Sequence, residues 1–419
     1  MLFRIEHLFH YNFKLCLLSN LSSIRINLMD HSKPTTIRAV RCHRFASVEQ
    51  QSTEANQRQK RPSFRPRKPK PLRLRECLSL DEVEYPSLPK RAKGTWVVIQ
   101  TEYAGIQYPD ALQARGLYQI KPRLPYVPGM DVVGVVKLVK LVTPSQNDKH
   151  NYHPIKNTNI RPGDRVMATL LDFGGTGGLS EVVLAPLKHV YKLPKNNFHQ
   201  TPRYGAAFAN IGRNYFAAYH ALVEVGQIDP SSSANASKIV LVDGASGGVG
   251  MATIELAKAM GCSVVAGVGS PSKIDAPKTL GADAVFCYGR TKASRRAFRK
   301  EVTRFCQQRH RAEGVDLVVD VVMGHLFQDA LVSCLKPLGT IALVGFAAGQ
   351  RPIKPGLLLI KQARVAGSIW TNIAFEASET NATNKYSKMV HTILRYLSSG
   401  SIAGRVDRIV PVSRFIVSL

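Results

Sequence analysis

One stretch of the sequence, residues 239–273, constrains the fold more than any other. It opens with the β-branched run 239–242, continues through a glycine-rich segment at 243–250, and then runs without glycine or proline over 251–260. A second apolar run follows at 263–266. Strand, tight turn, helix and strand in this order are typical of a parallel strand–helix–strand unit. We therefore predict a parallel sheet covered by helices.

The glycine-rich segment predicts a site for the pyrophosphate of a dinucleotide. It matches the dinucleotide-binding fingerprint with Ala245 in place of the first glycine. Gly247 and Gly250 would let a pyrophosphate approach the helix N-terminus, where free N–H groups and the helix dipole favour anions. A tight turn without a ligand would need similar glycines, but its position between a buried strand and a helix favours the nucleotide interpretation.

The end of the second strand favours NADPH over NADH. NAD-preferring sites usually carry Asp or Glu about twenty residues after the glycines, to bind the ribose hydroxyls. That place is held by Val268, Gly269 and Ser270, and Ser270 and Lys273 could bind and neutralise a 2′-phosphate. Alternatively, residues 270–272 only cap the next helix, and Asp275 argues against a phosphate nearby. We predict NADPH as the cofactor.

Charge is the most unusual feature of the composition. The 419 residues are 44% hydrophobic, enough for two domains or more, yet the net charge is +28 and the pI about 10. A basic run at 290–311 raises the question of nucleic acid. No aromatic residues interleave with it as base stacking requires, so a solvated helix face is the preferred interpretation.

The cysteine spacing and the first residues of the chain give information on the cellular compartment of the protein. The seven cysteines are scattered singly, which indicates neither a zinc cluster nor a disulfide framework and favours a reducing compartment. No apolar stretch approaches about 18 residues, so no membrane span is predicted. Residues 1–29 are compatible with an amphipathic transit peptide, or translation begins at Met29. Mitochondrial and cytoplasmic locations both remain open.

The remaining pattern predicts two domains of different character. Short strands and turns over 72–193 favour a mostly antiparallel β domain, with a first strand at 37–40 and a charged insertion at 49–71 expected to be disordered. A helix over 203–225 leads into the nucleotide domain. Further strands at 284–286, 315–319 and 340–344 alternate with helices, which is typical of a doubly wound parallel sheet.

Several motifs, in order, resemble the medium-chain dehydrogenase/reductase superfamily, and within it the zinc-free quinone oxidoreductase group related to zeta-crystallin. The resemblance covers about residues 36–415. It is carried by residues 104–110, 124–129, 162–166, 218–222, 244–250, 280–283 and 314–320.

The resemblance implies an α/β protein with a GroES-like β-rich catalytic domain, a doubly wound (Rossmann) domain and a cofactor held in the cleft between them. We expect an N-terminal extension over 1–35, the catalytic domain over 36–208, the Rossmann domain over 209–369 and a return to the catalytic domain over 370–419. Relatives continue past the equivalent of residues 409–412 with a helix and a strand. The catalytic domain is therefore expected to be truncated here. A homodimer is also expected from the family.

The residues at the zinc positions of the superfamily favour a metal-free site. Zinc-dependent members carry Cys where Gln107 stands and a His-Glu pair where Met130 and Asp131 stand. A catalytic zinc needs three ligands of Cys, His or carboxylate type, which Gln107 and Met130 cannot supply. His220, in an alanine-rich helix, is more often a packed or capping residue than a substitute ligand.

The resemblance also implies a set of cofactor contacts. Gly345 and Phe346 would lie against the nicotinamide ribose, with Ile369 and Trp370 beyond them, although Trp370 could equally be a core residue. The other implied contacts are Ser246, Gly247, Gly248, Val249 and Gly250 for the pyrophosphate, Ser270 and Lys273 for the 2′-phosphate, and Tyr288 on the adenosine side.

Two departures from the family affect the catalytic residues. Many relatives have Asn where Gln107 stands, and some have Tyr where Leu112 stands. The nearest hydroxyl is then that of Tyr108, which could hydrogen-bond an enolate, or only line the pocket. Gln107 and Tyr108 are the catalytic candidates.

Without a metal, the chemistry predicted is hydride transfer to an acceptor that is already electrophilic. Quinones and α,β-unsaturated carbonyls need no Lewis acid, so we predict their NADPH-dependent reduction. Two alternatives remain: an enoyl-thioester reductase of the same superfamily, or a catalytically quiet NADPH-binding protein with affinity for RNA.

Overall fold

The structure is a computed structural model, and it describes residues 15–18, 36–46, 73–89, 92, 94–142, 159–171, 177–194, 202–353, 355–375 and 384–415. Its described residues divide into two compact units. Those from 213 to 405 form one, here the α/β unit, and those before 213 and after 405 form the other, the β unit. The expected insertion at 49–71 lies outside the described residues, as does the extension at 1–35 apart from residues 15–18.

The α/β unit contains a six-stranded parallel sheet in the order β11-β10-β9-β12-β13-β14. Its strands are β9 (Ile239–Asp243), β10 (Ser263–Val268), β11 (Ala284–Cys287), β12 (Val315–Asp320), β13 (Leu335–Leu343) and β14 (Arg364–Gly367). Every residue of β9 is buried, as its unbroken apolar run predicts for a central parallel strand. The order reverses between β9 and β12, which is where ligands bind in open parallel sheets.

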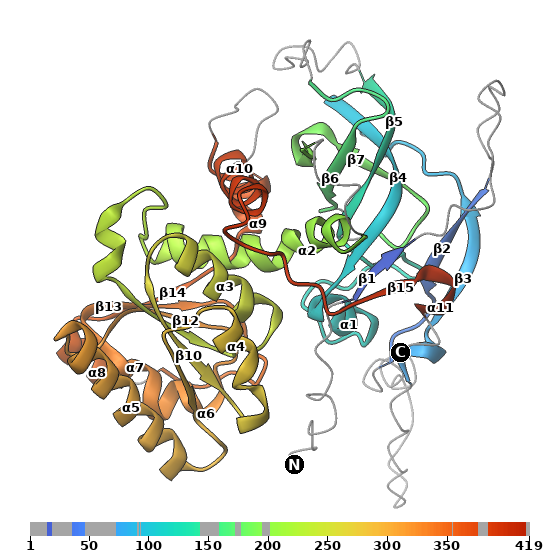
Figure 1. Ribbon diagram of the computed structural model, residues 1–419. Helices are drawn as coiled ribbons and strands as arrows, with labels where there is room; N and C mark the ends of the chain where they lie inside the picture. Colours follow the sequence, from blue (N-terminus) through green and yellow to red (C-terminus); the bar gives the residue numbers. More distant parts are fainter. Residues whose placement is uncertain are drawn as a thin grey trace, which may run out of the picture. The chain divides into compact units, whose positions relative to one another are not determined.

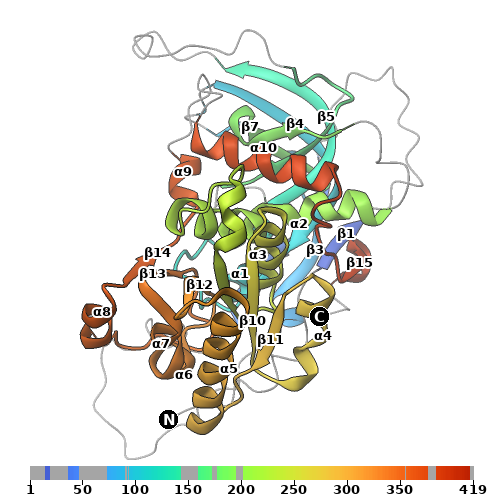
Figure 2. The ribbon, with the colours of Figure 1, turned by 60° about the vertical axis from the view of Figure 1, so that its left-hand side comes forward.

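Helices cover this sheet on both faces (Figures 1 and 2). Right-handed crossovers carry the chain along one face as far as β11 and along the other face after it. The helical segments of the α/β unit as a whole are α3 (Gly248–Ala259), α4 (Asp275–Thr279), α5 (Lys292–His310), α6 (Gly324–Leu326), α7 (Val332–Cys334), α8 (Pro355–Lys361), α9 (Thr371–Phe375) and α10 (Lys385–Ser398), with the π-helical segments η6 (His220–Val225) and η9 (Phe327–Leu331) and the 3₁₀ turns η7 (Ser233–Ser237) and η8 (Pro271–Lys273). The predicted doubly wound sheet is confirmed.

The β unit is built on a sheet that is antiparallel except where β1 runs parallel to β15. Its strands are β1 (Leu15–Leu18), β4 (Gly94–Ile106), β5 (Asp131–Val142), β6 (Arg165–Thr169), β7 (Val182–Pro186), β8 (Val190–Lys192) and β15 (Arg408–Pro411), beside a separate pair, β2 (Thr36–Cys42) and β3 (Leu78–Glu84). The strands are accompanied by the helices α1 (Tyr108–Ala114) and α11 (Val412–Phe415) and by the 3₁₀ turns η3 (Leu74–Glu76) and η5 (Leu187–His189). The predicted antiparallel domain is therefore confirmed.

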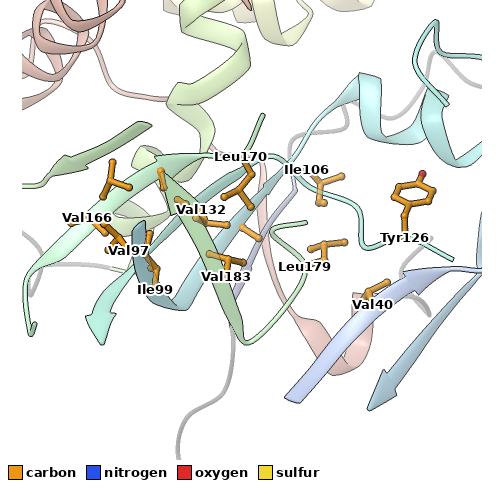
Figure 3. Packing of buried hydrophobic residues seen from close by; sticks show 14 of the residues in the cluster. Val40, Val97, Ile99, Ile106, Tyr126, Val132, Val166, Leu170, Leu179 and Val183 are labelled. Atoms are coloured by element: carbon orange, nitrogen blue, oxygen red, sulfur yellow. The ribbon is translucent and has the colours of Figure 1, made fainter. Parts of the chain in front are cut away.

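Buried aliphatic side chains from several strands form the core of the β unit. Val97 and Ile99 of β4, Val132 of β5, Val166 of β6 and Val183 of β7 are directed toward one another (Figure 3). Alternation along each strand places them on one side of the pleat. Burying a side chain of this size contributes about 1.5–3 kcal/mol relative to leaving it exposed, so this cluster is a main source of the unit's stability.

The chain passes from the β unit to the α/β unit within one helix, α2 (Pro202–Tyr219). The helix is kinked at Gly212, whose φ is −37° and ψ is −113°. A Cβ atom at Gly212 would lie 1.8 Å from Oδ1 of Asp131, so only glycine fits there. The crossing at 212/213 is close to the expected boundary at 208/209.

The return to the β unit comes at 405/406, later than the expected position near residue 370. The intervening residues pack within the α/β unit. Trp370 is only 6% exposed and lies edge-on to Phe216, with ring centroids 5.2 Å apart, and it stacks on Tyr386 of α10 at 6.4 Å. This aromatic cluster packs α10 within the α/β unit. Trp370 is therefore a core residue.

Candidate functional site

The glycine turn after β9 has the geometry of a tight turn into a helix. Gly244 adopts a φ of +66°, which favours glycine, and the backbone N–H of Gly247 donates to the carbonyl of Gly244 at 2.9 Å. Gly247 is the N-cap of α3, and Ser246 before it is buried. A Cβ atom at Gly250 would lie only 2.3 Å from the carbonyl oxygen of Gly244. The turn is packed directly onto the first turn of α3.

The N-terminus of α3 presents donors for an anion. The first N–H groups of a helix have no intrahelical acceptor, and in α3 these belong to Gly248, Val249 and Gly250. The carboxamide of Asn214 approaches this point, since a Cβ atom at Gly248 would lie 2.7 Å from its Oδ1. The structure therefore brings together all five residues predicted to contact a pyrophosphate.

The residues predicted to bind a 2′-phosphate follow β10 directly. Ser270 is the residue before η8, and Lys273 is the last residue of η8. Although Ser270 occupies the N-cap position, its hydroxyl lies 3.0 Å from that of Ser272 and makes no capping hydrogen bond within this described segment. The capping alternative for Ser270 is therefore not supported.

Tyr288 lies beside this segment, after β11. Its ring is near Gly269, where an added Cβ would be 3.5 Å from the hydroxyl, and it meets Phe298 edge-on at 5.8 Å. Burial, followed by the charge of neighbouring Asp243, raises the pKa of Tyr288 well above its ordinary value. The hydroxyl thus faces inward, toward Asp243 at the end of β9.

Gly345 and Phe346 follow β13 and lie against the end of β12. The backbone N–H of Val344 donates to the carbonyl of Asp320 at 2.8 Å, and a Cβ atom at Gly345 would lie 2.9 Å from the carbonyl oxygen of Val321. Phe346 is 42% exposed. All the predicted cofactor residues of the α/β unit therefore lie along one edge of one sheet, where its strands end.

Two acids at the same edge were not predicted from the sequence to have a role. Asp243 ends β9, Asp320 ends β12, and the two are opposite each other in the parallel pairing. Both are completely buried. The feature of the sequence that could have identified them is their position: each is the polar last residue of an apolar strand, at the point where the strand order reverses.

The two catalytic candidates lie in the β unit and face opposite ways. Gln107 precedes α1 and is 2% exposed, with its Nε2 donating to Oδ2 of Asp131 at 3.0 Å. Its backbone N–H donates to Oδ2 of Asp110 at 2.8 Å, which fixes the start of the helix. Tyr108, the first residue of α1, is 52% exposed. Partial burial raises the pKa of Tyr108, so its hydroxyl stays protonated at neutral pH.

The donor set beside Gln107 does not fit a catalytic zinc. Gln107 and Asp131 are hydrogen-bonded to each other, Asp131 also accepts from Thr169 at 3.4 Å, and Met130 supplies only a thioether. This site therefore offers one carboxylate, whereas a catalytic zinc requires three protein ligands. Among the residues that the structure describes, no three His, Cys, Asp or Glu side chains are grouped to hold a metal.

His220 also has the environment of a packed residue. It lies in the α/β unit, its Nδ1 is 2.8 Å from the hydroxyl of Ser368, and burial lowers its pKa. These contacts explain the histidine without a metal.

The basic run at 290–311 forms α5. Thr291 caps the helix, accepting from the backbone N–H of Ser294 at 3.0 Å, and the buried Arg295 pairs with Asp329 at 2.7 Å. Arg299, Lys300 and Arg304 line an open hollow of about 490 Å³ together with Thr303, Gln307, Glu313 and Ser333. One arginine is thus structural and the others lie on the surface. No helix in the described residues has the length and apolar content needed to cross a bilayer.

Family models match both units. Residues 93–195 match the model for the alcohol dehydrogenase GroES-like domain, and residues 248–392 match the model for zinc-binding dehydrogenase.

The chain is also similar in sequence to proteins named as quinone oxidoreductases. The quinone oxidoreductase of Lama guanicoe is 30% identical over 271 residues, which cover 65% of this chain and 70% of that protein. A quinone oxidoreductase-like protein 2 homolog of Nematostella vectensis is 27% identical over 310 residues, covering 74% and 73%.

Solved structures share the fold. A probable oxidoreductase from Mycobacterium abscessus is 25% identical with a TM-score of 0.62, covering 92% of this chain and 95% of that chain. The quinone oxidoreductase from Thermus thermophilus, whose structure is also known in complex with NADPH, is 25% identical with a TM-score of 0.52, covering 79% and 84%.

Proposed function

Since the chain belongs to the medium-chain dehydrogenase/reductase superfamily and is similar to its quinone oxidoreductases, we propose that it reduces quinones or α,β-unsaturated carbonyls with NADPH and without zinc. The observation that carries this proposal is the inward-facing pair of Gln107 and Asp131. It stands where zinc-dependent members hold their metal, and it cannot supply the ligands. Acceptors that are already electrophilic need no Lewis acid.

The proposal gives each cofactor residue a task. The free N–H groups of Gly248, Val249 and Gly250 bind the pyrophosphate, and Ser246 and Gly247 form the turn that faces it. Ser270 and Lys273 bind the 2′-phosphate, and Gly345 with Phe346 supports the nicotinamide ribose. When bound, NADPH would supply the hydride. The side chain of Tyr288 closes the adenosine side by packing over Gly269.

The proposed reaction also requires a hydrogen-bond donor for the product oxygen. Reduction of a quinone or enone places negative charge on an oxygen, and a donor aimed at that oxygen stabilises it. Tyr108 is an exposed and protonated hydroxyl on the first turn of α1. Gln107, predicted as catalytic, acts in this proposal as a positioning residue, because its contacts with Asp110 and Asp131 fix the point at which α1 begins.

A panel of acceptors tests the function. We expect NADPH oxidation with quinones and 2-alkenals, unchanged by metal chelators, and none with saturated aldehydes. NADPH binding without turnover on any acceptor would leave a nucleotide-binding protein in place of an enzyme. Turnover with acyl thioesters but not with free quinone would replace the proposal by the enoyl-thioester reductase.

Replacing Tyr108 with phenylalanine should lower kcat by tenfold or more and leave the affinity for NADPH unchanged. A hydrogen bond to a charged oxygen contributes about 1.5–3 kcal/mol, which corresponds to roughly tenfold to hundredfold in rate. Tyr191→Phe is the matched control, since that hydroxyl donates to the backbone carbonyl of Lys188 in the same unit. Equal kcat values for the two variants would remove Tyr108 from the mechanism.

A further inference from the structure

The two buried acids each hold one loop at the edge of the sheet. Oδ1 of Asp243 accepts from the backbone N–H of Gly244 at 2.6 Å, at the start of the glycine turn. Oδ1 of Asp320 accepts from the N–H groups of Val322 at 3.0 Å and Met323 at 2.6 Å. Each carboxyl therefore fixes the loop that follows its own strand.

These two loops touch each other. A Cβ atom at Gly244 would lie 2.6 Å from Cγ2 of Val322, so the glycine turn and the 321–324 loop are in close contact. Met323 has a φ of +56°, which is unfavourable for a side chain of this kind, and its hydrogen bond to Asp320 holds it there. Movement of either carboxyl would disturb both loops.

The Oδ2 atoms of Asp243 and Asp320 indicate how two acids can be buried on neighbouring strands. The Oδ2 atoms of Asp243 and Asp320 are buried, and among the described residues neither has a hydrogen-bond partner. Burial, and then the charge of Asp320, raises the pKa of Asp243 well above its ordinary value, and burial also raises the pKa of Asp320. Two buried carboxylates on paired residues of neighbouring strands repel each other when both are charged, whereas one shared proton would allow a hydrogen bond between them.

Few other titratable groups face the pair. The Tyr288 hydroxyl faces Asp243, where as a donor it lowers the pKa of that carboxyl, and Cys287 lies beyond Tyr288. The N–H groups of Gly244, Val322 and Met323 also favour the charged forms. These donors stabilise negative charge on the pair.

We propose that Asp243 and Asp320 share a single proton and so act as a latch, which holds the glycine turn against the 321–324 loop in the form that binds the dinucleotide. The latch rests on the proposed role of the turn as the pyrophosphate site. Loss of the proton places a second negative charge beneath the site of an anionic ligand and forces the two loops apart. Nucleotide affinity is then lost at alkaline pH.

The direction of the stability change follows from the raised pKa values. A carboxyl whose pKa is higher in the folded than in the unfolded chain binds a proton on folding. Its contribution to stability is complete below the unfolded value, for which 3.8 is the ordinary figure, and is lost as the pH rises through the folded value. The latch should therefore weaken both folding and binding as the solution becomes alkaline.

Replacing Asp243 with asparagine is the direct test. The amide oxygen can still accept from Gly244, and the amide nitrogen can donate to Asp320 without titrating. In the unmodified protein we expect the Kd for NADPH to rise by about tenfold for each pH unit above the pKa of the pair, since one proton is lost. The variant should show no such rise, and its Tm should exceed that of the unmodified protein at alkaline but not at acidic pH.

Asp316→Asn is the matched control, because Asp316 bridges the same two strands at their opposite ends. It accepts from the backbone N–H of Ile239 at 2.9 Å and pairs with Lys336 at 2.5 Å. This variant should keep the pH dependence of the unmodified protein. If Asp243→Asn fails to fold, Asp320→Asn serves instead, since it keeps an acceptor for Val322 and Met323.

Three outcomes decide the proposal. Parallel curves of Kd against pH for Asp243→Asn and the unmodified protein would overturn it. The infrared spectrum of the unmodified protein near neutral pH should contain a protonated-carboxyl band that the variant lacks. If the unmodified protein shows no such band, the proposal is also overturned. A protein that oxidises no acceptor but binds NADPH with this pH dependence would refute the proposed enzyme and retain the latch.

Discussion

Alanine at position 250 is expected to reduce the affinity for NADPH by about a hundredfold and to lower the Tm. The added Cβ would lie 2.3 Å from the carbonyl oxygen of Gly244 and 2.8 Å from Cα of Ala245, and both are backbone atoms that cannot rotate away. Overpacking of this kind costs about 1–3 kcal/mol, and the shortness of these contacts favours the upper end. The turn relieves these contacts by moving, so its binding geometry must be restored when the nucleotide binds, and a cost of about 3 kcal/mol for this corresponds to roughly a hundredfold in Kd.

Two other glycine variants separate the causes of this loss. At Gly247, the one described atom near an added Cβ is the carbonyl oxygen of Gly244, at 3.3 Å, so Gly247→Ala should fold normally and lose affinity only if a ligand lies against the turn. At Gly356 in α8, no described residue outside this helix has an atom within 4 Å of an added Cβ, so Gly356→Ala should change neither Tm nor Kd. Unfolding curves and fluorescence titrations of the three variants provide the comparison. A Gly250→Ala protein with unchanged Tm and Kd would contradict the structure of the turn.

The sheet of the α/β unit was predictable because its signals are local. A continuous apolar run bounded by glycine, as at β9, indicates a buried parallel strand without knowledge of its neighbours. Ser270 was predicted as a cofactor contact from its place after the second strand, whereas Tyr288 and Gly345 were implied by the family resemblance. In the structure all three follow strands at the same edge of the sheet, because the carboxyl ends of parallel strands share one edge.

The acid pair could not be predicted, because it depends on which strands are neighbours. Asp243 and Asp320 are far apart in the sequence and meet only because β12 pairs with β9 in one particular register. The same limit applies to Gln107, whose inward orientation depends on Asp131 from a different strand. The late return to the β unit depends on aromatic packing around Trp370, which has no periodic signal.

Reversing the charge at Lys273 is expected to change the preference between the two nicotinamide cofactors. Lys273 ends η8, directly after β10, where an adenosine 2′-phosphate would lie according to the proposed function. A pair of unit charges at contact near a surface interacts by about 4 kcal/mol, and screening of this partly exposed site reduces the figure. We expect Lys273→Glu to weaken NADPH by about thirtyfold to a hundredfold, which is about 2–3 kcal/mol, and to leave NADH nearly unchanged.

Lys278→Glu is the control for charge alone. Lys278 is exposed in α4, five residues further along, so its reversal changes the net charge by the same amount without approaching the proposed phosphate. Titrations of all three proteins with NADPH and NADH at low and high salt give the answer. The effect of Lys273→Glu on NADPH should shrink at high salt, because a charged contact is screened. Equal losses for the two cofactors would instead mean that the substitution distorts the end of β10, and the preference for NADPH would then need another source.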